Sequence, residues 1–306
     1  MSNYMREKAK NKLADSATFL SLLVFFFSSI ITLNVNASPI QLIDKKLKIN
    51  AEYLESKDKN KPFFLILHGT FAWHGMELIN ALQENLNNKK YGSLALTLSL
   101  AEDNRKQFFD CSHTILSKHE DAQKELNIWL TWLENKGYKN IHVIGHSRGG
   151  AQVAQFSINQ SKRINKVFLI APMVWDSNKT SDSFIQSNKK KLNELLKTIS
   201  TQTSEQLFNI NQAFHCSNTK ISNEAFISYY DSKPIKNTVE LFAKIKNPVY
   251  VYLGDSDRLT KDFNQQFSIL KKQPHVVVKT IEDADHYFRD FATEDIVEDI
   301  ISVLNL

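Results

Sequence analysis

The chain has 306 residues, of which 42% are hydrophobic and 23% are charged. This balance is typical of a folded protein with a hydrophobic core, and it excludes a largely disordered chain. The 38 basic residues exceed the 33 acidic residues by a small margin and are spread along the chain. Such a distribution indicates an ordinary solvated surface, and we expect no nucleic acid partner.

The first 37 residues differ in kind from the rest. Basic residues between Arg6 and Lys12 precede an uncharged apolar run at 17–33, and small residues follow at Val35 and Ala37. This order is typical of a secretory signal peptide that is cleaved after Ala37. The run is slightly shorter than the roughly 20 residues of a spanning helix, and an uncleaved membrane anchor is the alternative. In both cases we expect an exported protein, periplasmic or secreted, which contacts a membrane only if the segment is not cleaved.

Short apolar runs then alternate with amphipathic stretches as far as Pro172. Residues 41–54 have room for two strands ahead of the first clear one. Further strands are predicted near 63–67, 92–100, 140–145 and 166–172, and helices near 76–89, 120–136 and 149–160. Strands that read as continuous apolar runs and alternate with helices predict a mostly parallel sheet with helices on both faces.

The alternation stops for about 75 residues and then resumes. Residues 173–247 carry helical patterns and no convincing strand. A strand is predicted again from Val249, followed by a helix at 266–272, a strand at 275–281 and a terminal helix at 293–304. We therefore expect one α/β domain over 38–306, with a helical cap at about 173–247 inserted before the strand that leads to the candidate catalytic acid. Insertions at the carboxyl ends of parallel strands are where ligands bind.

The pattern G-x-S-x-G runs from Gly145 to Gly149, between a predicted strand and a predicted helix. A nucleophilic serine at such a turn projects its hydroxyl out of the fold, and flanking glycines let the backbone pack closely around it. The helix that follows offers unpaired N–H groups to a developing oxyanion. Ser147 is therefore the candidate nucleophile.

With this motif in place, the chain resembles the α/β-hydrolase superfamily over most of its length after residue 37. The resemblance implies a triad that follows the family's chain order. "YLGDSDRL" ends a strand in a G-x-x-D pattern, which selects Asp257 as the acid, with Asp255 as the alternative. "EDADHYF" follows the last strand and selects His286 as the base.

The resemblance also implies an oxyanion hole in the loop "HGTF". The backbone N–H groups of Thr70 and Arg148 would bind the oxyanion, while His68 would be structural. Many relatives carry an apolar residue or Gln where Arg148 stands. We expect its cation to lie near the acyl or leaving group, or to pair with a carboxylate of the cap.

These residues together predict hydrolysis through an acyl-enzyme, most simply of a small-molecule carboxylic ester, without a cofactor. Two alternatives stay open: a non-catalytic exported binding protein on the same fold, and an amide or peptide hydrolase. The stretch "CSHTILSKHED" contains His113, His119, Glu120 and Asp121 without a recognised ligand spacing, and we expect no metal.

The cap and the two cysteines give two further expectations. The apolar residues of the cap either line an acyl pocket, which would favour medium acyl chains over acetate, or only pack the cap onto the body. They are Phe184, Ile185, Leu192, Leu195, Leu196, Phe226, Tyr229 and Tyr230. Cys111 and Cys216 are both expected above the carboxyl ends of the strands, where an oxidising compartment would let them pair. Two separate thiols are the alternative.

Overall fold

The computed structural model describes residues 37–231, 238–260 and 273–304. The predicted signal segment, apart from Ala37, and the predicted helix at 266–272 lie outside these residues. No helix in the described part of the chain is long and apolar enough to cross a membrane.

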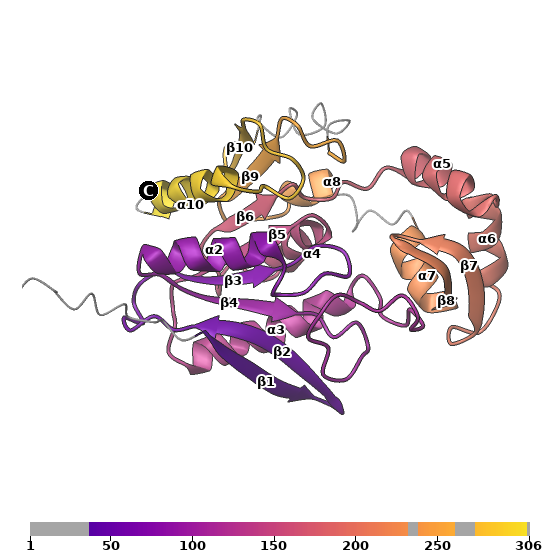
Figure 1. Ribbon diagram of the computed structural model, residues 1–306, viewed down its shortest axis with the longest axis horizontal. Helices are drawn as coiled ribbons and strands as arrows, with labels where there is room; N and C mark the ends of the chain where they lie inside the picture. Colours follow the sequence, from indigo (N-terminus) through magenta and orange to yellow (C-terminus); the bar gives the residue numbers. More distant parts are fainter. Residues whose placement is uncertain (1–36, 232–237, 261–272, 305–306) are drawn as a thin grey trace, which may run out of the picture. The chain divides into compact units, whose positions relative to one another are not determined.

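The body is built on an eight-stranded sheet in the order β1-β2-β4-β3-β5-β6-β9-β10 (Figure 1). The strands are β1 (Ser38–Asp44), β2 (Leu47–Leu54), β3 (Phe63–Leu67), β4 (Gly92–Thr97), β5 (Ile141–His146), β6 (Val167–Ile170), β9 (Val249–Gly254) and β10 (Val276–Ile281). Strands β1 and β2 pair antiparallel, β2 also pairs antiparallel with β4, and all other pairs are parallel. This arrangement confirms the predicted α/β fold with a mostly parallel sheet.

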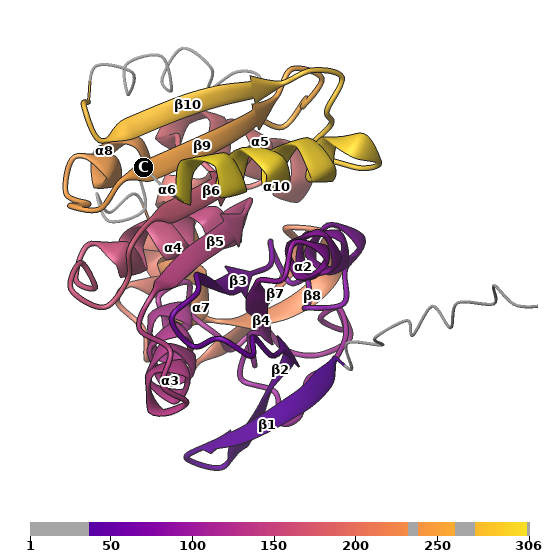
Figure 2. The ribbon, with the colours of Figure 1, turned by 90° about the vertical axis from the view of Figure 1, so that its left-hand side faces the viewer.

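Helices cover both faces of the sheet because alternate strand residues point in opposite directions. Phe64 and Ile66 of β3 pack with α2 and α10, whereas Phe63, Leu65 and Leu67 belong to the apolar core that includes residues of α3 and α4 (Figure 2). The four helices are α2 (Glu77–Asn88), α3 (Asp121–Asn135), α4 (Arg148–Ser157) and α10 (Phe291–Leu304). Every residue of β3 is buried, as its continuous apolar sequence predicts.

The cap follows β6, as expected, but it is not purely helical. It contains α5 (Ser177–Asn188), α6 (Leu192–Ile199), β7 (Leu207–Ala213), β8 (Cys216–Ser222), α7 (Asn223–Tyr230) and α8 (Thr238–Phe242). Strands β7 and β8 form an antiparallel hairpin, so the expectation of no strand in this segment is wrong. The hairpin was missed because its turn is Phe214–His215, with Phe214 at φ 58°, where the usual sequence signal would be Asn-Gly.

Two contacts fasten the hairpin to the loop that follows β4. Cys111 in that loop and Cys216 in β8 form a disulfide, with their Cα atoms 5.1 Å apart. Ile115 of the same loop forms an isolated parallel bridge with Ile221, through the Ile115 N–H to the Lys220 carbonyl and the Ser222 N–H to the Ile115 carbonyl. The loop and the cap therefore form one continuous structure beside the candidate site.

Candidate active site

Ser147 lies at the sharp turn between β5 and α4, with φ 54° and ψ −121°. A non-glycine residue in this region is strained, and surrounding contacts must hold it there. Its N–H donates to the Ile170 carbonyl, and its carbonyl accepts from the Met173 N–H, both at 2.9 Å. A Cβ atom on Gly145 would lie 2.5 Å from the Gly149 carbonyl oxygen, and one on Gly149 would lie 2.2 Å from the His68 carbonyl oxygen. Both glycines of the motif are therefore required by close packing around the turn.

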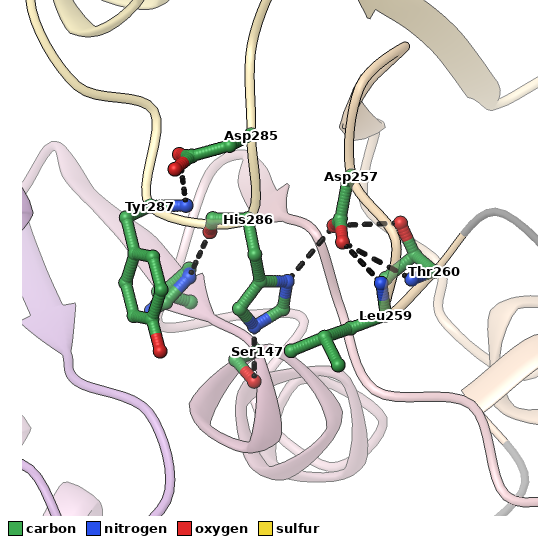
Figure 3. A network of polar contacts seen from close by, with 8 residues as sticks. Ser147, Asp257, Leu259, Thr260, Asp285, His286 and Tyr287 are labelled. Carbon is green, nitrogen blue, oxygen red and sulfur yellow. Dashed lines mark hydrogen bonds and ion pairs between the residues drawn. The ribbon is translucent and has the colours of Figure 1, made fainter.

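The structure brings Ser147, His286 and Asp257 into one hydrogen-bonded chain (Figure 3). His286 Nε2 lies 3.0 Å from Ser147 Oγ, and His286 Nδ1 lies 2.8 Å from Asp257 Oδ2. Asp257 follows β9 and His286 follows β10, so both side chains reach the site from loops at the carboxyl ends of parallel strands. His286 is 8% exposed and Asp257 is fully buried.

Asp257 is held by more than His286. Oδ1 accepts from the N–H groups of Leu259 and Thr260, and Oδ2 accepts from Thr260 Oγ at 2.7 Å. Burial by itself raises the pKa of Asp257, but the hydrogen bonds from His286 and Thr260 outweigh it and lower the pKa to about 2. The carboxylate is therefore ionised at neutral pH and oriented toward the imidazole. Asp255, the alternative acid, is exposed.

His146, which sequence reasoning did not single out, positions the loop that carries His286. Its Nε2 donates to the His286 carbonyl at 2.9 Å. Burial, and then the nearby His286, lower the pKa of His146 to about 3, so it remains a neutral donor at physiological pH. Its place next to the nucleophile is the only sequence signal that points to it.

The loop after β3 brings Thr70 next to the first residue of α4. Within the described residues, neither the Thr70 N–H nor the Arg148 N–H donates to another backbone group. His68 of the same loop is buried, with Nδ1 2.8 Å from the Gly69 carbonyl and Nε2 accepting from the Leu98 N–H at 3.1 Å. Both ring nitrogens of His68 are therefore engaged by the backbone.

Comparison with known families decides the classification. Residues 62–292 match the family model described as the alpha/beta hydrolase fold. The chain belongs to this family. A search of the curated proteins finds no match to the chain.

Solved structures similar to this α/β-hydrolase share its fold at low sequence identity. Est1E from Butyrivibrio proteoclasticus is 15% identical with a TM-score of 0.61, and the comparison covers 89% of this chain and 100% of Est1E. A second structure of Est1E, with ferulic acid bound, gives a TM-score of 0.64 at 15% identity and covers 87% and 100% of the two chains. The Pyrococcus furiosus esterase Pf2001 gives a TM-score of 0.58 at 18% identity and covers 89% and 92%.

Two cavities of this α/β-hydrolase are lined by residues that neighbour the triad in the sequence. One, of about 670 Å³, is lined by Trp73, Phe108 and Tyr287, the last being next to His286. The other, of about 320 Å³, is lined by Arg148, Met173 and residues of the cap. Both cavities have room for a small bound molecule.

The side chain of Arg148 is partly buried beneath the cap. Its Nε donates to Thr70 Oγ at 3.0 Å, and its guanidinium carbon lies 4.6 Å from the ring centre of Phe214 and 5.3 Å from that of Tyr229. Among the described residues, no carboxylate forms an ion pair with it. Burial lowers the pKa of Arg148, since a guanidinium loses hydration there. The expected pairing with a carboxylate of the cap is therefore not found among these residues, and the position near the reacting groups stays an expectation.

The apolar residues expected in the cap divide between lining and packing. Phe184, Tyr229 and Tyr230 line the smaller cavity. Leu192 and Phe226 are buried in the core, Leu195 and Leu196 pack against it, and Ile185 is exposed. Some of the cap residues therefore line a cavity and others pack against the core, whereas the acyl pocket stays an expectation.

The residues weighed as metal ligands have other partners. His113 is exposed and pairs with Glu102, while Glu120 accepts from Ser228 Oγ at 2.7 Å. Asp121 accepts from the Lys118 N–H, and the N–H of the buried residue His119 donates to Ser228 Oγ. These four side chains do not form a group of possible metal ligands in the described part of the chain. Cys111, His215 and Cys216 do lie close together, but both sulfurs are in the disulfide.

Proposed function

We propose that this α/β-hydrolase is a serine hydrolase that cleaves small carboxylic esters through a covalent acyl-enzyme. The observation that carries the proposal is the chain from Ser147 Oγ to His286 to Asp257, with separations of 3.0 and 2.8 Å, at a strained turn. A serine hydroxyl is a weak nucleophile at neutral pH and becomes effective when a base removes its proton.

The reaction follows from this geometry. Ser147 Oγ attacks the ester carbonyl while His286 Nε2 takes its proton, and the Asp257 carboxylate stabilises the imidazolium. The N–H groups of Thr70 and Arg148 stabilise the oxyanion. The carbon–oxygen bond to the alcohol breaks as His286 returns the proton to it. Water, deprotonated by His286, then attacks the acyl-enzyme and releases the acid and free Ser147.

An ester is the favoured substrate over an amide. Pf2001 is an esterase, and Est1E binds ferulic acid, both in keeping with a small ester. The two cavities among the described residues offer room for a small molecule. Hydrolysis of 4-nitrophenyl esters from acetate to dodecanoate tests the proposal, with 4-nitroanilides of the same acids as the amide control.

We expect turnover of the esters and a loss of about 10⁴-fold or more in Ser147→Ala, with thermal unfolding unchanged. Medium acyl chains should exceed acetate in kcat/KM. Faster turnover of the anilides would favour the amide or peptide hydrolase. No turnover of any ester by the wild-type protein would favour the binding protein.

We also propose that the protein is exported and that residues 1–37 are a signal peptide. The disulfide between Cys111 and Cys216 supports an oxidising compartment. N-terminal sequencing tests this proposal, after the whole chain has been expressed in a host that processes signal peptides. A start at Ser38 in the exported fraction is expected, whereas an intact N-terminus in the membrane fraction would indicate the anchor.

A further inference from the structure

The smaller cavity, which is lined by Arg148, contains basic and aromatic residues. Arg148 of the body and Lys179 of the cap both contribute to its lining, and no Asp or Glu does. Trp175, Phe214, Tyr229 and other aromatic residues form much of the rest. A guanidinium in a cavity whose lining residues include no carboxylate attracts an anion more strongly than a neutral chain.

Arg148 is oriented so that part of its hydrogen-bonding capacity stays available. Thr70 Oγ accepts from Nε, and the rings of Phe214 and Tyr229 lie against the guanidinium plane. Nη1 and Nη2 have no hydrogen-bond partner within the residues that the structure describes. The two terminal nitrogens of a planar guanidinium match the two oxygens of a carboxylate, because an arginine fork binds a carboxylate through parallel hydrogen bonds.

The position of Arg148 places such an anion next to the reaction. Arg148 directly follows the nucleophile, and Met173, which also lines the cavity, donates its N–H to the Ser147 carbonyl. The lining of this cavity therefore includes the residue that follows the nucleophile and a residue hydrogen-bonded to its backbone. The second cavity is lined by Tyr287, which follows His286 in the sequence.

We propose that the cavity under the cap is an anion subsite in which Arg148 binds a carboxylate carried by the ester substrate. The aromatic rings that line the cavity reduce the access of water to this ion pair. Because the guanidinium is desolvated here and no carboxylate among residues 37–231, 238–260 and 273–304 pairs with it, the substrate's carboxylate supplies the partner. Hydrolysis of such a substrate rests on the proposed function, whereas binding of the carboxylate to Arg148 does not.

Matched pairs of esters test the subsite by kinetics. One pair consists of the 4-nitrophenyl monoester of adipic acid, which carries a carboxylate on the acyl side, and the 4-nitrophenyl ester of adipic monoamide, which carries a neutral carboxamide there. The other pair consists of 4-carboxyphenyl hexanoate and 4-carbamoylphenyl hexanoate, which carry the carboxylate and the carboxamide on the alcohol side. The uncatalysed rate of each ester is subtracted. We expect a preference of about 10- to 100-fold in kcat/KM for the carboxylate in one of the two pairs, as for charge-assisted hydrogen bonds.

Substitution of Arg148 separates recognition from packing. In Arg148→Gln the carboxylate-to-carboxamide ratio should fall to about 1, and Arg148→Lys should keep part of it. A ratio near 1 in both pairs for the wild-type protein would overturn the proposal. So would an equal loss for both members of each pair in Arg148→Gln, since Arg148 would then only pack the cap onto the body.

Binding to Ser147→Ala tests the subsite without hydrolysis. Calorimetric titration compares adipic monoamide with the neutral adipamide, and 4-hydroxybenzoate with 4-hydroxybenzamide. We expect at least one anion to bind about 10-fold or more tightly than its amide, and Arg148→Gln in the same background to remove the difference. If the anion binds to Ser147→Ala but the wild-type protein hydrolyses no ester, the proposed function is refuted and the anion subsite is still supported. Equal affinity for both members of both pairs, or an anion preference that persists in Arg148→Gln, would overturn the subsite.

Discussion

Arg148 Nε and Thr70 Oγ are joined by a hydrogen bond of 3.0 Å, although the two residues are 78 positions apart in the sequence. This bond connects the loop after β3 to the first turn of α4. The backbone N–H groups of the same two residues are the proposed oxyanion donors. One side-chain contact thus sets the spacing between the two groups that must converge on a single oxygen atom.

Thr70→Val should lower kcat/KM for 4-nitrophenyl hexanoate by about 10-fold. Valine keeps the shape of threonine but removes the acceptor, so the loop loses a hydrogen bond to a charged group that is worth about 1.5 kcal/mol or more. Thr70→Ser retains the hydroxyl and is the matched control. Steady-state kinetics measure kcat/KM for both variants, and equal values for Thr70→Val and Thr70→Ser would contradict this positioning role.

Asp257→Asn should reduce kcat by about 10³- to 10⁴-fold, whereas Asp255→Asn should change it by less than about 3-fold. Only Asp257 contacts the imidazole, through Oδ2 and His286 Nδ1. An asparagine there no longer stabilises the imidazolium. The two variants have the same change of charge, so equal losses, or a larger loss in Asp255→Asn, would mean that the acid is assigned to the wrong residue.

The disulfide should contribute about 2–4 kcal/mol to the free energy of unfolding, because it closes a long loop in the unfolded chain. Cys111 and Cys216 are separated by 105 positions. Urea unfolding of the Cys111→Ser/Cys216→Ser double variant measures the loss, and reduced wild-type protein is the control. Thiol counting on the denatured, unreduced, exported protein should find no free thiol. Two free thiols per chain would rule the bridge out.

Glu125 makes stability fall as the pH rises. The side chain is 6% exposed and accepts from both the N–H and the Oγ of Ser99. Burial raises the pKa of Glu125 to about 7 from its ordinary 4.5, against the smaller opposing effect of the Ser99 hydrogen bonds. Between about pH 4.5 and 7, Glu125 therefore keeps its proton in the folded state but has lost it in the unfolded state. The contribution of Glu125 to the free energy of unfolding is complete below the unfolded pKa and is lost as the pH rises through the folded pKa of about 7.

Glu125→Gln removes that titration. The unfolding free energy of the variant minus that of the wild type should increase by on the order of 2 kcal/mol between pH 5 and pH 8. Urea unfolding at several pH values measures the difference, in which the titration of every other group cancels. A difference that stays constant, or that decreases with pH, would show that Glu125 is ionised in the folded protein throughout this range.

Much of the body was predictable because its signals are local. The continuous apolar run of β3 is buried at every position, and α3 buries Leu126, Trp129, Leu130 and Leu133 on one face, as their helical spacing predicts. The nucleophile turn was also readable, since the glycines that its packing requires are part of a short motif. The order of the candidate triad residues came from the resemblance.

The unpredicted features depend on contacts between distant segments. The hairpin of the cap has polar residues on its exposed face and turns at Phe214, which carries no turn signal. The His146 hydrogen bond to the His286 carbonyl joins residues 140 positions apart. The surroundings of Arg148 likewise come from the loop after β3 and from the cap, so no pattern around residue 148 could reveal them.

The central claim is that Ser147 is a nucleophile activated by His286. Mass spectrometry of the protein after treatment with a fluorophosphonate tests it most directly, because the reagent reacts with an activated serine. The proposed mechanism predicts one adduct per chain, located on the peptide that contains Ser147. The adduct should be absent in Ser147→Ala and formed at least about 100-fold more slowly in His286→Ala. An unmodified wild-type protein, or an adduct that survives in Ser147→Ala, would contradict the assignment.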